Sequence, residues 1–540
     1  MIRKLFAVVL LLTIGARAAL PAATVPLDHW AYELADELII RGLWAGEDYG
    51  ERPWTRATFA EAVGYLEEQR LRGEVGLHRA TRGMLERLLA EFAPEVELWR
   101  SDRGPADRAD YTAEEVLDPQ LEVGARVRLD GGYRLVDREI PPGLGGAVDI
   151  PPEPAEEGLY HRERFYPLLG AGYADELALW ARAEADTDGL EDEDWRGLEW
   201  KSGISAQFDY GYLSWCPTDW FRAWAGRDQV QWGRGLGGSL LLSGRAPATD
   251  GFGYAVGLGP LRFSYFHSSL DIWREDYGGE RHYFNRYLTG HRLAWIIAPN
   301  IVIGLGEATV YGGEGRALDL SYLNPLMLHY VEQLSGRVHN DNPFWQIDFD
   351  IVPVPGYRLW GQLMIDDYQY EDDPEPPHIG FLIGGGWADP FNLPGLTLEL
   401  EYLKVWNWTY NVLPDHNKLL YLDRPLGYPG GNDGDRWSLR LGWTFDADWS
   451  AGLDAAYSRR GEGRITDEWA AKGFRSEPFP SGIVEETQEY GLEAVWTPSR
   501  AWELGATVSY TRADNYDNRP DAVESVLYGG LWVDYLIDWR

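Results

Sequence analysis

The sequence contains a single cysteine, Cys216, among 540 residues. It therefore excludes an intramolecular disulfide and a cysteine metal cluster. Beyond the amino-terminal segment it lacks a run of about 18 uncharged apolar residues, which a membrane-spanning helix requires. The net charge is -37, and no basic stripe is present that could meet the phosphates of a nucleic acid. The motifs of phosphate loops, zinc proteases and serine hydrolases are also absent, and we expect no cofactor.

Aromatic residues, by contrast, are abundant, with 26 Trp, 31 Tyr and 17 Phe. Many of them bracket four alternating runs near the carboxyl end, namely Trp437–Phe445, Trp449–Tyr457, Trp502–Tyr510 and Leu531–Trp539. Each run has an apolar residue at every second position, which places these side chains on one face of a strand. Eight steps of roughly 3.3 Å span about 26 Å, close to the height of the apolar band of an outer-membrane barrel. The pattern predicts an all-β transmembrane antiparallel β-barrel.

Further alternating segments extend this pattern toward the amino terminus, and they are Leu121–Leu129, Trp200–Tyr212 and Leu396–Tyr402. The connections alternate in length. Residues 446–448 and 497–500 make tight turns, whereas 458–487 and 511–525 make long loops, as the two ends of a membrane barrel require. We place the barrel over residues 121–540 and expect 16 to 18 strands, with a lumen wide enough for water and therefore a polar inward face.

The amino terminus has the features of a secretory signal. Arg3 and Lys4 precede an apolar stretch, Leu5–Ile14, and Ala16-Arg17-Ala18 fits the small-residue cleavage pattern. We therefore expect residues 1–23 to be a signal peptide that is cleaved near Ala18 to Ala23. The mature chain is then exported to the outer membrane of a Gram-negative-type cell.

Residues 24–98 have helical rather than strand spacing. Three apolar stripes begin at Trp30, Phe59 and Leu77, the first behind an expected N-cap at Asp28. Three short amphipathic helices can bury one another's stripes, so we predict a small helical domain on the periplasmic side. The charged, irregular residues 99–120 are expected to be the linker to the barrel.

Three later segments have a distinctive order of motifs. They are Gly226–Gly235 followed by Gly237–Ser243, then Gly290–Leu293 with Gly304–Glu307 and Tyr322–Pro325, then Asn340–Asn342 with Asp348–Asp350 and Gly361–Asp367. Together with the helical amino-terminal domain, this order resembles the capsule assembly protein Wzi family. The resemblance implies an 18-stranded barrel, which makes 18 the favoured count, and a periplasmic helical bundle. It also implies a non-enzymatic protein that retains capsular or other extracellular polysaccharide at the cell surface.

A second, shorter resemblance lies in the helical domain. Asp28–Tyr32, Gly42–Trp44 and Arg52–Arg56 are similar to one S-layer homology repeat. In some outer-membrane porins such a repeat grips peptidoglycan-linked polymer, although no long coiled coil follows it here. The alternative function is therefore a diffusion porin attached to the cell wall through this domain. Peptidoglycan and periplasmic export components are accordingly further candidate partners, and a soluble secreted sugar-binding or sugar-cleaving β-protein is the third alternative.

Charged and amide side chains in the three motif segments are the candidates for lining the lumen or contacting polysaccharide. They are Arg227, Arg234, Arg292, Glu307, Asn324, Asp341, Asn342, Asp348, Asp350, Asp366 and Asp367. One interpretation is that they pair with one another in a wet lumen; the other is that they hydrogen-bond sugar hydroxyls or an acidic polymer. A glycosidase would need two carboxyl groups with separated pKa values, and no local sequence singles out such a pair.

One acidic loop has the oxygen density that calcium favours. Asp186, Asp188 and Asp192 are the candidate ligands, around a glycine that permits a tight turn. The spacing is too irregular for an EF-hand. A solvated loop between strands is the simpler expectation, so we predict no metal as part of the main function.

Overall fold

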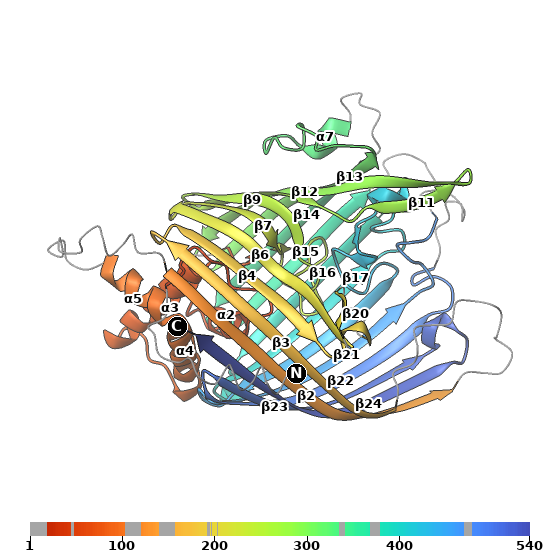
Figure 1. The fold of residues 1–540 in the computed structure, drawn as a ribbon. Coiled ribbons are helices and arrows are strands. Elements are labelled where there is room, and N and C mark those ends of the chain that lie inside the picture. The colour runs from red at the N-terminus through yellow and green to blue at the C-terminus, as the bar shows by residue number, and fades with distance from the viewer. Residues whose placement is uncertain are drawn as a thin grey trace.

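Figure 1 shows a computed structural model of the chain. It describes residues 19–44, 48–102, 120–139, 157–191, 195, 197–201, 203–333, 341–367, 378–468 and 478–539. The expected signal peptide up to residue 18 and most of the expected linker lie outside the described residues.

Eighteen antiparallel strands close into a barrel, which confirms the favoured strand number. β2 pairs with both β3 and β24 and so joins the two ends of the sheet. The ring strands are β2 (Gln120–Glu139), β3 (Gly158–Tyr173), β4 (Leu177–Asp186), β6 (Ile204–Thr218), β7 (Phe221–Asp228), β9 (Thr249–Leu258), β10 (Leu261–Ser269), β12 (Glu280–Ala298), β13 (Ile301–Glu314), β14 (Asn342–Val354), β15 (Tyr357–Asp367), β16 (His378–Ala388), β17 (Leu396–Val405), β20 (Gly434–Thr444), β21 (Trp449–Arg460), β22 (Glu485–Ser499), β23 (Trp502–Asp514) and β24 (Val523–Trp539).

Six shorter strands complete the sheet structure. β5 (Leu198–Lys201) and β11 (Trp273–Tyr277) lie against β6 and β12. β1 (Glu51–Arg52) pairs with β8 (Gln231–Trp232), and β18 (Leu420–Tyr421) pairs with β19 (Arg424–Pro425). The β1–β8 pair joins the amino-terminal region to a segment that follows β7.

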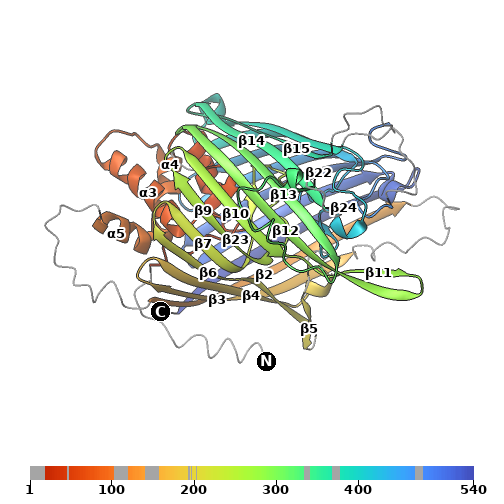
Figure 2. The same cartoon turned by 90° about the horizontal axis from the view of Figure 1, so that it is seen from above.

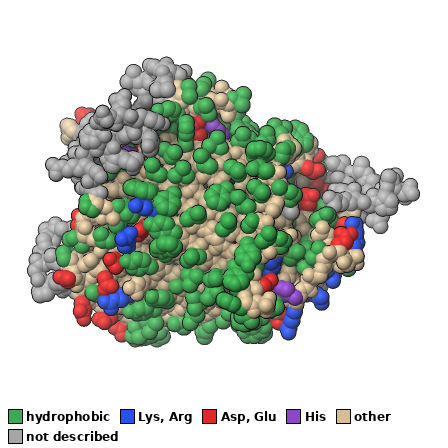
Figure 3. Space-filling model, turned by 180° about the vertical axis from the view of Figure 1, so that it is seen from behind, with side chains coloured by type: hydrophobic (Ala, Val, Ile, Leu, Met, Phe, Trp, Pro, Cys, Tyr) green, Lys and Arg blue, Asp and Glu red, His purple; other side chains and the backbone are tan. Residues whose placement is uncertain are grey.

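The barrel wall alternates as the sequence predicts. On β12, Leu293, Trp295 and Ile297 are exposed, whereas the intervening Arg292 and Ala294 are fully buried. Figure 3 shows hydrophobic side chains spread over this outer surface. An apolar exterior around a polar or filled interior is the arrangement of a lipid-facing barrel wall. No helix in the described part of the chain is long and apolar enough to cross a membrane.

One predicted strand is interrupted. The run from Trp200 to Tyr212 was expected to be continuous, but the chain reverses at Gly203, which has a φ of +78°, so that β5 folds back on β6. The register between β4 and β6 also shifts at Asp209, and such a bulge moves the following side chains to the other face. Phe208 is consequently exposed while Tyr210 and Tyr212 are buried. Alternation in sequence thus conceals both a turn and a bulge.

The two ends of the barrel differ as expected. Tight turns such as 299–300, 355–356 and 500–501 gather at one end, where the carboxyl terminus also lies, and the long connections gather at the other. The helices α2 (Ala31–Ile40), α3 (Arg56–Leu71), α4 (Arg79–Glu91) and α5 (Ala93–Asp102) lie at the tight-turn end (Figure 2). The short helix α7 (His329–Gln333) lies outside the wall near β13.

The helical region differs from its prediction in two details. α2 begins at Ala31 with Trp30 as its N-cap residue, because Asp28 instead pairs with Arg182 of β4. A fourth helix, α5, spans Ala93–Asp102, so the helical domain extends four residues into the segment that we assigned to the linker. It packs on α3.

Candidate functional site

The lumen is partly filled by a segment that enters it. Between β7 and β9, residues 229–248 fold inward, and we call them lumen loop A. Trp232 and Leu240 of this loop are fully buried against inward side chains of the wall such as Trp360 and Met364. We expected a polar inward face, so this apolar core is a correction.

Glycine in lumen loop A permits close packing, as its sequence suggests. Gly233 has a φ of +80°, and a Cβ there would lie 2.5 Å from the Gln362 side chain. Gln362 is itself fixed, because it accepts a hydrogen bond from the backbone of Leu240 at 2.8 Å and donates one to the carbonyl of Arg234 at 2.7 Å. β15 therefore holds this loop through a single amide side chain.

A second inward segment, residues 406–433, packs against the first, and we call it lumen loop B. Its Leu419 and Leu420 belong to the same buried cluster. Ser243 of loop A donates its backbone N–H to the carbonyl of Leu426 at 2.9 Å. On the wall, the buried Arg286 donates to three loop B carbonyls, those of residues 416, 418 and 420, at 2.6 to 2.8 Å. The two loops thus form one plug on the β10–β17 side of the lumen.

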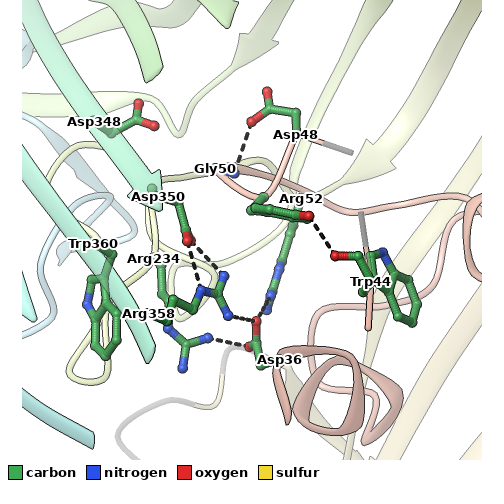
Figure 4. Close-up of polar contacts among 12 residues, drawn as sticks. Asp36, Trp44, Asp48, Gly50, Arg52, Arg234, Asp348, Asp350, Arg358 and Trp360 are labelled. Atoms are coloured by element: carbon green, nitrogen blue, oxygen red, sulfur yellow. Dashed lines mark hydrogen bonds and ion pairs between the residues drawn. The ribbon is translucent and has the colours of Figure 1, made fainter. Parts of the chain in front are cut away.

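The helical domain is seated in the barrel mouth by a buried ion-pair cluster (Figure 4). Asp36 of α2 lies 2.7 Å from Arg52, 2.5 Å from Arg234 of loop A and 2.8 Å from Arg358 of β15. Arg358 also donates two hydrogen bonds to Asp350, at 2.8 and 2.6 Å. Burial alone would raise the pKa of Asp36, but attraction to Arg234, Arg52 and Arg358 outweighs it and lowers the pKa.

A second cluster lies beside the first. Arg292 of β12 has no exposed surface; it donates to Asp348 at 2.7 and 3.1 Å and also pairs with Asp48 of the helical domain. Glu51 lies 3.7 Å from Arg292 and accepts a hydrogen bond from Ser264 at 2.8 Å. Burial raises the pKa of Glu51 to about 7, with the attraction of Arg292 opposing the shift.

Further ion pairs surround the mouth and link the amino-terminal region to the turns and strand ends of the barrel. They are Arg41 with Asp389, Arg79 with Asp446, Arg87 with Glu503, Arg500 with Glu91 and Arg182 with Asp28. Between the helices and β2, β4 and β24 remains a cavity of about 320 Å³, bordered by Trp30, Arg87 and Arg126. The domain is thus held around its circumference but does not fill the whole mouth.

The opposite half of the lumen remains accessible to solvent. Arg440 of β20 and Asp454 of β21 face inward, and their side chains are 43% and 59% exposed. The inward Arg292 on the plugged side has no exposed surface. The barrel is therefore filled on one side and wet on the other.

A surface of arginine and aromatic side chains lines this wet half. We call Arg128, Arg134, Arg138, Tyr160 and Trp532 the arginine–aromatic surface. The guanidinium of Arg128 lies 4.4 Å from the Trp532 ring, and that of Arg134 lies 5.6 Å from the Tyr160 ring. Arg138 pairs with Glu524 and Arg128 with Asp130, but among the described residues no carboxylate lies within ion-pair distance of Arg134. Such a surface can bind carboxylates and stack on sugar rings.

The structure brings together only some of the predicted residues. Arg234, Arg292, Asp348 and Asp350 converge where the helical domain meets the wall, and Asn342 and Asp366 face lumen loop B. Arg227 pairs with Asp250 on the outer face of the wall, and Asp367 is exposed at the end of β15. Glu307, Asn324 and Asp341 lie on or under an outer segment, residues 315–333. Contact of any of them with polysaccharide stays a prediction.

In the acidic loop, one of the candidate calcium ligands is already engaged in an ion pair. Asp186 is fully buried and lies 2.6 Å from Arg162, and it also accepts the backbone N–H of Asp188. Asp192 lies outside the described residues. Calcium binding there stays untested.

Sequence reasoning missed Asp36, Asp48 and Arg358, and it missed the arginine–aromatic surface. One signal was present: β2 carries Arg126, Arg128, Arg134 and Arg138 on the face opposite its apolar side chains. In a chain of net charge -37, such a basic row is unusual and marks an inward surface.

The comparisons with known proteins agree with this architecture. The family model of the capsule assembly protein Wzi matches residues 168–524. Among solved structures, the chain is similar to Wzi of Escherichia coli, described as an outer membrane protein involved in group 1 capsule assembly and a carbohydrate-binding β-barrel, with 14% identity, a TM-score of 0.59 and coverage of 95% of this chain and 99% of that one. At that identity the likeness shows the fold alone.

The chain is less similar to two other solved structures. OccK3 of Pseudomonas aeruginosa and OccAB4 of Acinetobacter baumannii each have 10% identity and a TM-score of 0.43, and each match covers 77% of this chain and 96% or 98% of the other. A comparison with curated sequences found no match.

Proposed function

The chain belongs to the capsule assembly protein Wzi family, and from that premise we propose that it binds extracellular or capsular polysaccharide and retains it at the outer membrane. In this proposal the protein is a binding protein without catalytic activity. Its helical domain faces the periplasm and its long loops face the exterior, because short turns are periplasmic in barrels of this type.

The single observation that carries the proposal is the filled half of the lumen. Lumen loops A and B form a buried apolar core with the wall, and the helical domain is held at the mouth by the ion pairs of Asp36 with Arg358 and of Asp48 with Arg292. Filling half of the lumen narrows the path for solutes, so it does not help a diffusion channel. The same packing makes the wall rigid, and a rigid wall can hold a polymer in the wet half of the lumen.

The arginine–aromatic surface is the proposed contact for that polymer. Arginine presents a planar fork of donors that matches a carboxylate, so it suits the uronic or other acidic sugars of surface polysaccharides. Tyr160, which is half-buried, offers a ring face beside Arg134. Trp532 is buried and supports the guanidinium of Arg128 that stacks on it. Arg134, for which no carboxylate lies within ion-pair distance among the described residues, is the donor most available to an acidic ligand.

The alternative is a diffusion porin, and the solvent exposure of Arg440 and Asp454 favours it. Planar-bilayer recording separates the two functions. A steady, ohmic conductance of the purified protein supports the porin, whereas silence supports the plugged anchor.

The deciding experiment measures surface polysaccharide in the cell pellet and in the medium, for the parent strain, a deletion of this gene and a strain that carries R128A/R134A/R138A. We expect unchanged total polymer with release into the medium in the deletion and in the triple variant. Arg281→Ala, on an exposed outer hairpin, is the matched control and should behave as the parent. If the deletion leaves the distribution of polysaccharide between pellet and medium unchanged, the anchoring role is wrong.

A further inference from the structure

The outer wall carries a polar patch that is covered by part of the chain itself. Residues 315–333, which we call the outer segment, fold back over β10, β12 and β13, and α7 lies outside the barrel there (Figure 1). Tyr265 and Tyr311 are buried under the segment. The hydroxyl of Tyr265 donates to the carbonyl of Tyr322 at 2.9 Å.

The side of the outer segment that faces away from the wall is apolar. Leu320 is 79% exposed and Leu326 is 86% exposed, as suits side chains in contact with lipid. The segment thus buries polar wall residues and replaces them with an apolar face. Polar groups enclosed between a wall and lipid are costly unless they are fully paired.

Three potential metal ligands meet in this enclosed layer. His291 of β12 and Glu307 of β13 are register neighbours on the wall, and His329 comes from α7. One ligand atom of each lies within 4.8 Å of the other two. The two imidazole rings meet edge to face, with centroids 4.8 Å apart and an interplanar angle of 69°.

The histidines have nitrogen atoms that lack partners. His329 has no exposed surface; its Nδ1 is bonded to Thr309 Oγ1 at 3.0 Å, and its Nε2 is buried with no hydrogen-bond partner among the described residues. His291 Nδ1 is also buried with no hydrogen-bond partner among the described residues, and the Nε2 of that ring faces Glu307. Because an unsatisfied buried polar atom costs free energy, the open Nε2 of His329 points to a ligand. The Thr309 bond fixes the ring of His329, as outer partners do at metal sites.

Glu307 is held in place by three donors. It accepts the backbone N–H groups of His329 at 2.7 Å and Tyr330 at 2.9 Å and the indole N–H of Trp345 at 2.8 Å. Its Oε2 also lies 3.3 Å from His291 Nε2. The carboxylate is thus oriented toward both imidazoles before any ion arrives.

We propose that His291, Glu307 and His329 bind a divalent first-row transition-metal ion of the Zn²⁺ type, which fastens the outer segment to the barrel wall. Two imidazoles and one carboxylate suit such an ion, and calcium or magnesium would prefer oxygen ligands only. At bond lengths of about 2.0–2.2 Å the three ligand atoms must draw together, so metal binding pulls α7 toward β12 and β13.

The test uses the full-length protein in detergent, freed of metal with a chelator and then titrated with Zn²⁺ by calorimetry and with Co²⁺ by visible absorption. We expect one saturable site, and an affinity at least tenfold lower in His291→Ala and in His329→Ala. His161→Ala, which removes an exposed histidine on β3, should bind as the wild type does. No saturable binding, or binding that survives both cluster variants, overturns the proposal.

A second measurement is needed because a substitution in the cluster could by itself detach the outer segment from the wall. Hydrogen exchange of residues 315–333 is compared in the wild type with and without Zn²⁺, with no substitution involved. We expect slower exchange of α7 when the ion is present, and His291→Ala should abolish that difference. Unchanged exchange in the wild type at saturating Zn²⁺ contradicts the fastening role. Neither outcome depends on polysaccharide binding.

Discussion

Arg358 of β15 donates a hydrogen bond to Asp36 of α2 at 2.8 Å, across a sequence separation of 322 residues. Both groups lie in the interior of the barrel mouth. Because Arg234 and Arg52 share the same carboxylate, one side chain joins the helical domain, lumen loop A and the wall. The contacts that fix these three parts relative to one another therefore share the Asp36 carboxylate.

Asp36→Ala should loosen the helical domain. Three guanidinium groups would lose a shared counterion in a buried site, and breaking a buried pair in this way costs about 3–5 kcal/mol. We expect faster hydrogen exchange in α2 and a lower free energy of unfolding in denaturant. Glu68→Ala, which breaks the exposed pair with Arg72, is the control and should cost about 0–1 kcal/mol. Equal effects of the two substitutions would contradict this assignment.

The seating of the domain should depend on pH through Glu51. The pKa of Glu51 in the folded protein is about 7, against an ordinary value of 4.5. The folded state therefore holds the proton more tightly, and the stabilisation is complete below about pH 4.5 and lost as the pH rises through about 7. The free energy of unfolding of the wild type, relative to Glu51→Gln, should fall by about 1–3 kcal/mol over that range. A difference that is flat with pH would contradict the shift.

Gly233→Ala should displace lumen loop A. The substitution combines the left-handed backbone with an overlap on Gln362, and overpacking of this kind costs about 1–3 kcal/mol beyond the backbone strain. Gly315→Ala is the matched control, since Gly315 has a φ of +64° but open space around it, so it carries only the strain of roughly 1–2 kcal/mol. Trypsin cleavage after Arg245 should increase in Gly233→Ala and not in the control.

Signal cleavage should occur after Ala18 and not after Ala23. Leu20 is fully buried, its N–H donates to Glu95 at 3.1 Å, and it packs in a cluster with Ala23 and Trp180. A mature chain that began at Thr24 would lose these contacts. Mass spectrometry of the purified protein should find Ala19 as the first residue, and a start at Thr24 would show that residues 19–23 have no role in the barrel.

The strands of the carboxyl half could be predicted because lipid imposes one pattern on every outward position. The run Trp437–Phe445 therefore lies within β20 except for its last residue, and the run Trp502–Tyr510 lies within β23. Lumen loop A could not be recognised in the same way. Its Leu240–Leu242 run is as apolar as a strand, and only the three-dimensional packing shows that it points inward.

The site was harder to predict than the fold because its contacts join distant residues. Nothing local to Asp36 indicates Arg358, and nothing local to His329 indicates Glu307. The turn at Gly203 was missed for a related reason at shorter range. Residue types alternate on both sides of the turn, so the alternation does not reveal it. Local pattern determines which face a side chain occupies, whereas the partner across the lumen depends on the curvature of the whole sheet.

The seam between β2 and β24 has a consequence for the order of assembly. The first strand of the ring finds one of its two partners only in the last strand of the chain, so the ring cannot close until synthesis and export have reached the carboxyl end. Until then the helices have no completed mouth to occupy. The acidic and basic groups that later become buried, such as Asp36 and Arg358, are therefore hydrated until that moment. Closure of the seam is thus the step after which the helical domain can take its place in the barrel mouth.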